Sequence, residues 1–309
     1  MSNARICWAV SDGRAGMANQ VLGLAQALAR LTPLAITPVT LARTGPLAVE
    51  DGPAPDIWIG CGRAAVRAAP AVRAAHPDAL MVYIQDPRAH YGVFDLILPP
   101  HHDRLAGPNV LPLIGSPNRV TPELLEAERI AFADRLAQIR APRAAVLIGG
   151  ESKHHRFSEG ACAYLLDRIE ALRARRIGLL ITLSRRTPDA FAALIRERYG
   201  QQPDIWLHQG DGPNPYFAFL AGADWIFVTE DSTNMLTEAA ATGTPVYRLG
   251  VDGRPGKFRR LYAALEGHGA VRPFLGALER WTYVPLHETE RAAQRVLEML
   301  DARCDMRAA

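Results

Sequence analysis

The segment 223–246 places the strongest constraint on the fold, because it reads as a strand, a polar turn, a helix and a second extended segment. Residues 225–228 form a short run of aromatic and β-branched side chains, typical of a strand buried on both faces. The polar run 230–232 is suited to begin a helix, which we expect over 235–242. Gly243 ends that helix, so the chain returns to an extended conformation immediately afterwards.

The turn after this strand is also the strongest candidate for a ligand site. In an open parallel sheet, ligands bind at the carboxyl ends of the strands, and a helix N-terminus there offers free N–H groups to a phosphate. Glu238, one turn into the helix, is placed to accept two hydrogen bonds from a ribose diol. The residues that we assign to nucleotide binding here are Glu230, Asp231, Ser232, Asn234 and Glu238. The alternative is a surface unit whose carboxylates only cap the helix.

The order of strand, polar turn and helix recurs along the whole chain. Short apolar runs predict strands at 6–10, 56–60, 80–84, 94–98 and 109–113 in the first half, and at 144–148, 178–183, 205–208 and 225–228 in the second. At 309 residues the chain is long for a single core, so two domains are expected. A helix over 122–139 and the linker 140–143 divide it into an N-terminal domain, 1–140, and a C-terminal domain, 141–309.

Two turns in the first half carry polar residues at the ends of buried strands. The first begins at Asp12 and is a glycine-bearing loop between a strand and a helix, although it is neither a G-x-G-x-x-G nor a Walker sequence. The second contains Asp86, at the end of the strand 80–84, where polar residues are better placed for binding than for packing. In each case the alternative is a tight turn whose polar groups bond only the nearby backbone. The other candidates on this side, which we assign to an acceptor, are Gly13, Arg14, Gly16, Asn19, Gln20, Gln85 and Arg88.

The turns of the second half are suited to phosphates. Gly149 and Gly150 follow its first strand, and their lack of a side chain lets a ligand's phosphates approach the backbone. Ser184 and Arg185 follow the next strand, where an arginine can clamp a diphosphate; solvated arginines are the alternative. The segment 253–260 is the most basic of the chain and suits contact with an anionic acceptor or a membrane surface, unless it is only a solvated loop.

The composition excludes several other functions. The net charge of +3 is too small to indicate a nucleic-acid-binding protein. The four cysteines are scattered without metal-ligand spacing, and the pair His101-His102 lacks a third ligand, so no metal site is expected. The sequence has no apolar run of the ~18 residues that span a membrane, and no signal peptide. We therefore expect a cytoplasmic protein, and peripheral contact with the inner membrane stays open.

Several blocks of the sequence together resemble the mitochondrial fission Elm-type family, over essentially the whole chain. They are residues 11–20, 83–88, 149–152, 184–188 and 229–232, with the sequences SDGRAGMANQ, YIQDPR, GGES, SRRTP and TEDS. Plant members of this family are associated with recruiting a dynamin-related protein to mitochondria, whereas bacterial members are usually described in terms of nucleoside-diphosphate sugars. The two successive Rossmann-like halves also resemble the GT-B glycosyltransferase architecture. This resemblance implies an α/β fold in which two Rossmann-like domains face each other across a cleft, with the final helix, 289–302, packing back on the first domain.

A wider similarity is to the lipid-intermediate N-acetylglucosaminyltransferase of peptidoglycan synthesis. The resemblance implies that Glu238 corresponds to the ribose-binding glutamate of that enzyme. The enzyme has a histidine in its first glycine loop where this chain has Asn19, and an amide cannot act as a base. A catalytic carboxylate would therefore have to come from Asp12 or Asp86.

The sequence thus favours an inverting-type glycosyltransferase without a cofactor. It would take a nucleotide-diphosphate sugar in its second half and an unidentified acceptor, lipid-linked or anionic, in its first. No Asp-x-Asp motif occurs, so we expect helix ends and arginines, rather than a metal, to balance the phosphate charge. The first alternative is a non-catalytic adaptor that keeps the fold as an interaction surface. The second is a sugar-nucleotide epimerase, which would need acid–base groups on both sides of the sugar.

Overall fold

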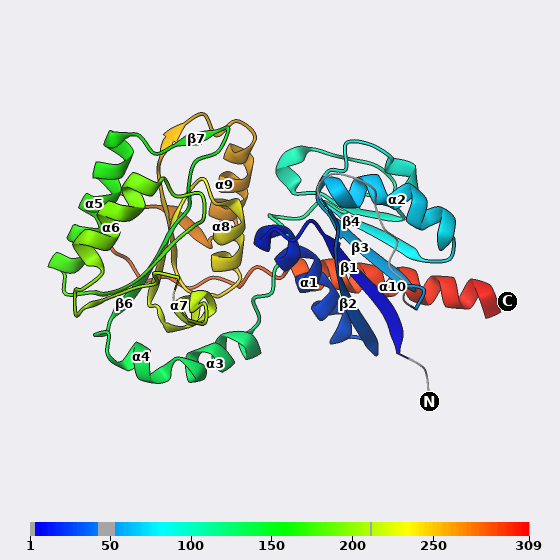
Figure 1. The fold of residues 1–309 in the computed structure, drawn as a ribbon, viewed down its shortest axis with the longest axis horizontal. Helices are drawn as coiled ribbons and strands as arrows, with labels where there is room; N and C mark the ends of the chain where they lie inside the picture. The colour runs from blue at the N-terminus through cyan, green and yellow to red at the C-terminus, as the bar shows by residue number, and fades with distance from the viewer. Residues whose placement is uncertain (1–3, 43–52, 211, 309) are drawn as a thin grey trace. The chain divides into compact units, whose positions relative to one another are not determined.

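The computed structural model describes residues 4–42, 53–210 and 212–308, which fold into two compact α/β units (Figure 1). Unit 1 comprises Met1–Arg119 and His287–Ala309, and unit 2 comprises Val120–Leu286. The predicted fold class, α/β with Rossmann-like halves, is confirmed by the parallel sheet in each unit.

Unit 1 is built on a five-stranded parallel sheet with the strand order β2-β1-β3-β4-β5. Its elements are β1 (Arg5–Ser11), α1 (Ala15–Ala29), β2 (Leu34–Thr40), β3 (Ile57–Cys61), α2 (Arg63–Ala75), β4 (Leu80–Ile84), η1 (Tyr91–Val93), β5 (Leu96–Leu98), η2 (His101–Asp103) and α10 (Glu288–Ala308). The predicted strands 6–10 and 80–84 are therefore confirmed, whereas 109–113 forms only isolated bridges to β5 and the residues after it.

The sheet of unit 1 is buried on both faces because its apolar side chains alternate along each strand. On β1, Cys7 and Ala9 pack against α1 and α10, whereas Trp8 and Val10 pack against α2. Successive side chains of a strand point to opposite faces, so one apolar run supplies two cores. Figure 1 shows α1 and the red helix α10 on one side of this sheet and α2 on the other.

Unit 2 contains a six-stranded parallel sheet with the order β13-β11-β10-β6-β8-β9 and a separate antiparallel pair, β12-β7. Its elements are α3 (Pro122–Ala131), α4 (Ala133–Ala137), β6 (Arg143–Ile148), β7 (His155–Arg156), α5 (Glu159–Ala174), β8 (Gly178–Leu183), α6 (Asp189–Tyr199), β9 (Ile205–Leu207), α7 (Tyr216–Gly222), β10 (Trp225–Thr229), α8 (Thr233–Ala240), β11 (Val246–Leu249), β12 (Asp252–Gly253), α9 (Phe258–Gly267) and β13 (Val271–Pro273).

A hydrophobic core of unit 2 lies between its sheet and the helices α5 and α6. Val146 and Phe227 on the sheet pack there with Leu165 of α5 and Ile195 of α6. α7 and α8 contact the strands from the other side (Figure 1). Ser158 directly precedes α5, and its hydroxyl accepts a hydrogen bond from the Ala161 N–H group at 3.2 Å and so caps the helix.

The division between the two units lies after Arg119 rather than at the predicted linker 140–143. The physical reason is that α3 packs against α7, so the residues before the linker belong with unit 2. The single helix predicted over 122–139 is two helices that meet at Phe132. At the other end of the chain, α10 packs against α1 and belongs to unit 1.

The order of the strands reverses once in each sheet, and this reversal fixes where a ligand is expected. In unit 1 the chain passes from β1 to β2 on one side and then returns to β3 on the other. In unit 2 it passes from β6 to β8 and β9, and then returns to β10 on the other side of β6. Ligands of open α/β sheets bind outside the strand carboxyl ends at such switch points. The turns after β6 and β10 are therefore the candidate site of unit 2.

Candidate functional site

The two turns at the switch point of unit 2 are joined to each other by hydrogen bonds. The Gly149 N–H group donates to Thr229 Oγ1 at 2.7 Å, and the Gly150 N–H group donates to Asp231 Oδ2 at 2.7 Å. Thr229 is the last residue of β10, and Asp231 lies in the turn that follows it. The glycine turn after β6 and the acidic turn after β10, which are far apart in the sequence, thus form one structure.

The space beside both glycines is filled by the protein itself. A Cβ atom at Gly149 would lie 2.2 Å from Asp231 Oδ2, and one at Gly150 would lie 2.0 Å from the carbonyl group of Arg186. Contacts this short are not tolerated, so neither position can carry a side chain without movement of its neighbours. The sequence predicted glycines that leave room for a ligand; in the structure the same glycines leave room for Asp231 and Arg186.

Asp231 is the most deeply buried charged group of this turn, with a side chain that is 0% exposed. Its Oδ2 atom accepts hydrogen bonds from Gly150 and, at 3.3 Å, from the Arg186 guanidinium. Its Oδ1 atom has no hydrogen-bond partner within the described part of the chain. Burial raises the pKa of the Asp231 carboxyl group, and the hydrogen bond from Gly150 acts in the opposite direction.

Arg186, rather than Arg185, is the arginine that reaches the switch point. Its guanidinium donates to the carbonyl oxygens of Gly150 at 3.3 Å and Glu151 at 3.1 Å as well as to Asp231. The side chain of Arg185 is exposed. Ser184, the other residue predicted on this turn, accepts a hydrogen bond from the Arg186 N–H group at 3.1 Å. Both arginines follow the same strand, and the sequence alone does not tell which one turns inward.

Glu238 lies on α8 with its carboxylate held beneath the surface. The hydroxyl group of Tyr216, the first residue of α7, donates to Glu238 Oε2 at 2.6 Å. Burial raises the pKa of Glu238 to about 7, and the hydrogen bond from Tyr216 partly opposes this shift. Tyr216 was not among the predicted site residues, because the only signal for it is an aromatic hydroxyl at the start of a helix, which is a common feature. A buried carboxylate with an ionisation near neutrality is typical of functional sites.

The remaining predicted residues of this turn divide between packing and the start of α8. Glu230 forms an ion pair with Arg248 and accepts a hydrogen bond from the Val251 N–H group at 3.3 Å, so its carboxylate binds residues of β11 and of the segment that follows it. Ser232 precedes α8, but its side chain makes no capping hydrogen bond within the described residues. Asn234 lies half-buried in the first turn of the helix. The carboxylates of this turn are therefore not helix caps.

Both candidate bases of unit 1 are held by neighbouring groups. Asp12, whose side chain is 4% exposed, forms an ion pair with Arg14 at 2.7 Å. Asp86 accepts hydrogen bonds from the Arg88 N–H group at 2.9 Å and from the Tyr91 hydroxyl group at 2.8 Å. The Arg88 N–H group, and the Arg14 N–H group that donates to Asp12 Oδ1 at 3.3 Å, are the nearby backbone contacts expected of a tight turn, whereas the Arg14 guanidinium and the Tyr91 hydroxyl are side-chain partners.

The other acceptor-side candidates gather at the carboxyl edge of the same sheet. Gln85 Nε2 donates to Gln20 Oε1 at 3.0 Å, and Cys61 Sγ lies 3.3 Å from the same oxygen. Gln85 has a φ of 88°, a left-handed conformation that is strained for a residue with a side chain. Gly13 also has a positive φ, 76°, in the turn before α1. The rest lie at Arg14, which precedes α1, at Gly16 and Asn19 within α1, and at Arg88, two residues beyond Asp86.

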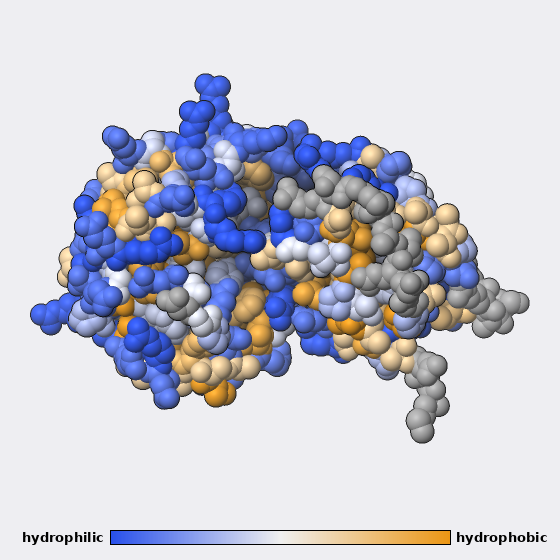
Figure 2. Space-filling model, viewed as in Figure 1, coloured by the Kyte–Doolittle hydropathy of each residue, from blue (hydrophilic) through white to orange (hydrophobic). Residues whose placement is uncertain are grey.

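The basic segment 253–260 is paired with a second basic stretch. β12 pairs with β7, and the Arg254 N–H group donates to the His154 carbonyl oxygen at 2.9 Å, which sets 253–260 beside 153–156. His155 is buried between the two stretches, with its Nε2 atom 3.1 Å from the Tyr262 hydroxyl group. We call the exposed cations of the two stretches the basic surface, and its residues are Lys153, Arg156, Arg254 and Arg259. It lies in the hydrophilic area over β7 and α9, blue at the top of this unit in Figure 2.

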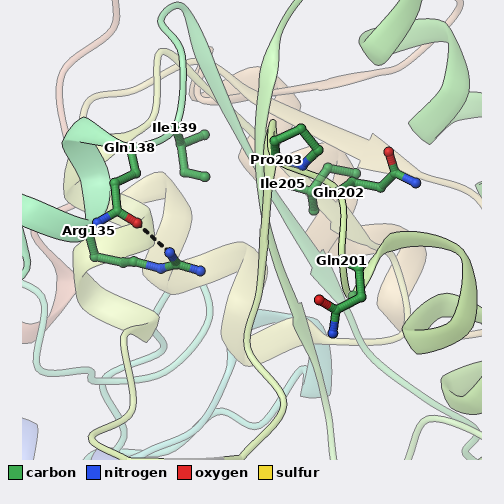
Figure 3. Close-up of a pocket in the computed structure, with 8 residues that line it drawn as sticks. Arg135, Gln138, Ile139, Gln201, Gln202, Pro203 and Ile205 are labelled. Carbon is green, nitrogen blue, oxygen red and sulfur yellow. Dashed lines mark hydrogen bonds between the residues drawn. The ribbon is translucent and has the colours of Figure 1, made fainter.

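A pocket of about 330 Å³ lies at the opposite edge of the unit 2 sheet. Its lining residues are Arg135, Gln138, Ile139, Gly200, Gln201, Gln202, Pro203 and Ile205, with Arg135 and Gln138 hydrogen-bonded to each other (Figure 3). Ile205 begins β9, and Ile139 precedes β6, so this is the amino edge of the sheet. Ligands of such sheets bind at the carboxyl edge, and the pocket is therefore not the candidate site.

Within the described residues, no group of three or more His, Cys, Asp or Glu side chains is arranged to hold a metal ion. Among the same residues, no helix has the length and apolar character needed to cross a membrane.

Comparison with known sequences identifies one family and two relatives. The family model for mitochondrial fission ELM1 matches residues 15–300. The mitochondrial fission protein ELM1 of Arabidopsis thaliana is 31% identical over 281 residues, which cover 82% of this chain and 65% of that protein. The chain thus spans less than two thirds of the plant relative. The uncharacterized protein RP120 of Rickettsia prowazekii (strain Madrid E) is 27% identical over 350 residues, which cover 93% of this chain and 96% of that protein.

Comparison with solved structures gives neighbours of GT-B type. The UDP-GlcNAc 2-epimerase from Neisseria meningitidis, solved with UDP-GlcNAc bound, has a TM-score of 0.58 at 12% identity and covers 96% of this chain and 98% of its own. The Escherichia coli ADP-heptose lps heptosyltransferase II has a TM-score of 0.51 at 13% identity and covers 99% of this chain and 100% of its own. At these identities the likeness establishes the fold, which is GT-B-like.

Proposed function

The chain belongs to the mitochondrial fission ELM1 family, and we propose that it binds a nucleotide-diphosphate sugar in unit 2 and acts as a glycosyltransferase. The observation that carries the proposal is the carboxylate of Glu238, buried on α8 directly beyond the switch-point turn and hydrogen-bonded by Tyr216. A carboxylate that only capped or solubilised a helix would not be buried with a tyrosine as its partner.

The chemistry of a nucleotide suits these groups. The Tyr216 hydroxyl occupies Glu238 Oε2, which leaves Oε1 to accept a hydrogen bond from a ribose hydroxyl. The start of α8, which has no acidic residue in its first turn, and the guanidinium of Arg186 supply positive potential for the phosphates. On this proposal, helix dipole and arginine balance the charge of the leaving diphosphate, and the transfer is metal-independent.

Transfer with inversion requires a base that removes the proton from the acceptor hydroxyl as the diphosphate leaves. We retain Asp12 and Asp86 of unit 1 as the proposed bases. Asp12 would first have to weaken its ion pair with Arg14, and Asp86 its bonds to Arg88 and Tyr91. The basic surface of unit 2 supports an anionic or lipid-linked acceptor, and with it a cytoplasmic protein in peripheral contact with a membrane.

A non-catalytic adaptor remains the second candidate, and a specific observation favours it. Both carboxylates that could serve as bases are engaged by their own neighbours in the free protein, as expected of turns without a catalytic role. A sugar-nucleotide epimerase is the third candidate. The epimerase neighbour has a TM-score of 0.58 and the heptosyltransferase neighbour 0.51, and at 12% and 13% identity these likenesses give the fold without separating the two activities.

The decisive first experiment is isothermal titration calorimetry with a panel of nucleotide-diphosphate sugars, on wild type, Glu238→Ala and the exposed control Glu197→Ala. Loss of a buried hydrogen-bond acceptor should weaken binding by about 1–3 kcal/mol in Glu238→Ala, with Glu197→Ala unchanged. Equal affinities for all three proteins would remove Glu238 from the site. Wild type that binds a donor but transfers nothing to a broad acceptor panel would favour the adaptor.

A further inference from the structure

The donors that a phosphate would use at the glycine turn are bound to a carboxylate of the protein. Asp231 Oδ2 lies 2.7 Å from the Gly150 nitrogen and 3.3 Å from Arg186 Nη2. A backbone N–H group on a glycine turn and an arginine guanidinium are the two kinds of donor that proteins commonly direct at phosphoryl oxygens. One anionic oxygen that accepts from both therefore has the environment of a phosphoryl oxygen.

The binding of Asp231 in this position is incomplete. Its side chain is fully buried, and Oδ1 has no hydrogen-bond partner within the described residues. A buried carboxylate oxygen without a partner is costly, and it regains hydrogen bonds if the side chain turns out to solvent. The guanidinium of Arg186, in contrast, is half exposed, so it can contact an anion that arrives from outside.

We propose that the Gly150 N–H group and the Arg186 guanidinium form a phosphoryl subsite, which the Asp231 carboxylate occupies in the free protein and a ligand's diphosphate occupies when it binds. The inference rests on the proposed nucleotide-sugar function and names the place of the phosphates within it. α8 begins two residues after Asp231, so the diphosphate would also lie at the N-terminus of that helix.

The charge of Asp231 then acts against the ligand in two ways. The carboxylate competes for the two donors, and after its release it stays close to the phosphate and repels it. An asparagine keeps an oxygen for Gly150 and Arg186 but has no charge. Asp231→Asn should therefore bind a diphosphate more tightly than wild type, which is the reverse of the usual effect of substituting a residue in a binding site.

The test is calorimetric titration of the full chain with inorganic pyrophosphate, at one pH and one salt concentration, for wild type, Asp231→Asn and Asp167→Asn. Asp167 is an exposed carboxylate on α5, so its substitution makes the same change of net charge away from the turn and from the basic surface. We expect about tenfold tighter binding for Asp231→Asn and little change for Asp167→Asn. Equal gains in the two variants, no gain in either, or no binding of pyrophosphate to any of the three would overturn the proposal.

A second measurement covers the case in which Asp231→Asn does not fold. In wild type, saturating pyrophosphate should shift the amide resonance of Gly150 strongly, because that N–H group changes its acceptor; an unchanged resonance contradicts the proposal.

Titration with nucleotide sugars distinguishes a failure of this inference from a failure of the proposed function. If pyrophosphate gives the expected result but no nucleotide sugar binds, the subsite stands and the nucleotide-sugar function fails. If Glu238→Ala weakens the binding of a nucleotide sugar and Asp231→Asn changes the affinity for neither pyrophosphate nor the sugar, the function stands and the subsite fails.

Discussion

At the scale of single residues, the ionisation of Glu238 predicts a dependence of stability on pH. Its pKa in the folded protein is raised by burial from 4.5 to about 7, which corresponds to roughly 3 kcal/mol. Between these two pH values the unfolded chain has released the proton while the folded protein still holds it, so the free energy of unfolding falls as pH rises. Glu238→Gln has no such titration. The stability of the variant relative to wild type should therefore increase from about pH 4 to pH 8 in urea denaturation, and a constant difference would contradict the assigned burial.

The same two residues show how far a sequence can predict a site. Glu238 was identified because a carboxylate one turn into a helix at a strand's carboxyl end can accept hydrogen bonds from a ribose diol, and because the family resemblance implies a ribose-binding glutamate there. Its partner Tyr216 lies on another helix, and only the fold brings the two side chains together. Asp231 and Gly149 were both predicted, but for contact with a ligand, whereas the structure fits them against each other. The sequence locates polar residues at the ends of strands. It does not show which of them contact one another in the free protein and which are left to contact a ligand.

At the scale of elements, the pairing of β7 with β12 predicts a membrane-binding surface. Two basic residues near an anionic bilayer contribute about 1 kcal/mol each. The double variant Arg254→Ala, Arg259→Ala should therefore bind vesicles of phosphatidylcholine and phosphatidylglycerol more weakly by about 2 kcal/mol, which is a roughly thirtyfold smaller binding constant. Co-sedimentation with the vesicles measures it. Arg196→Ala with Arg198→Ala on α6 removes the same charge from exposed positions elsewhere in the unit. If both double variants lose the same amount of vesicle binding, or the first loses none, the basic surface does not bind membranes and only contacts solvent.

Elements were predictable from the sequence where they are buried on both faces, and less so at the edges of the sheets. β3, β4, β6 and β10 read as continuous apolar runs because each has a neighbour on either side. β2, at the edge of its sheet, was not predicted, because it is only partly buried and contains Pro38. The segment 109–113 has the apolar pattern of a strand, yet it forms only isolated bridges at Val110 and Leu113. The pattern of apolar residues indicates which segments are buried, but it does not indicate how many residues of a segment pair with a neighbouring strand.

At the scale of the whole molecule, the chain completes unit 1 only with its last helix. Ala292, Val296 and Leu300 of α10 are buried in the same core as Leu24 and Leu28 of α1. A linear reading of the sequence assigns α10 to the domain that precedes it, and only the GT-B resemblance indicated otherwise. Because part of this core comes from the C-terminal helix and the rest from residues 7–113, unit 1 cannot be finished until α10 has been synthesised, whereas unit 2 is a continuous segment.

This arrangement predicts that the two units respond differently to damage in α10. Leu300→Ala removes a buried side chain and should lower the stability of unit 1 by about 2–4 kcal/mol, while Glu298→Ala, an exposed change on the same helix, should have little effect. Hydrogen exchange followed by mass spectrometry resolves the outcome by segment. Faster exchange is expected in α1, β1 and β3, and unchanged exchange in β6, β10 and α8, because the elements that these three pack against most extensively belong to unit 2. Loss of protection in both units together would show that the chain unfolds as one cooperative body, and the nucleotide site that we propose in unit 2 would then depend on the helix that completes unit 1.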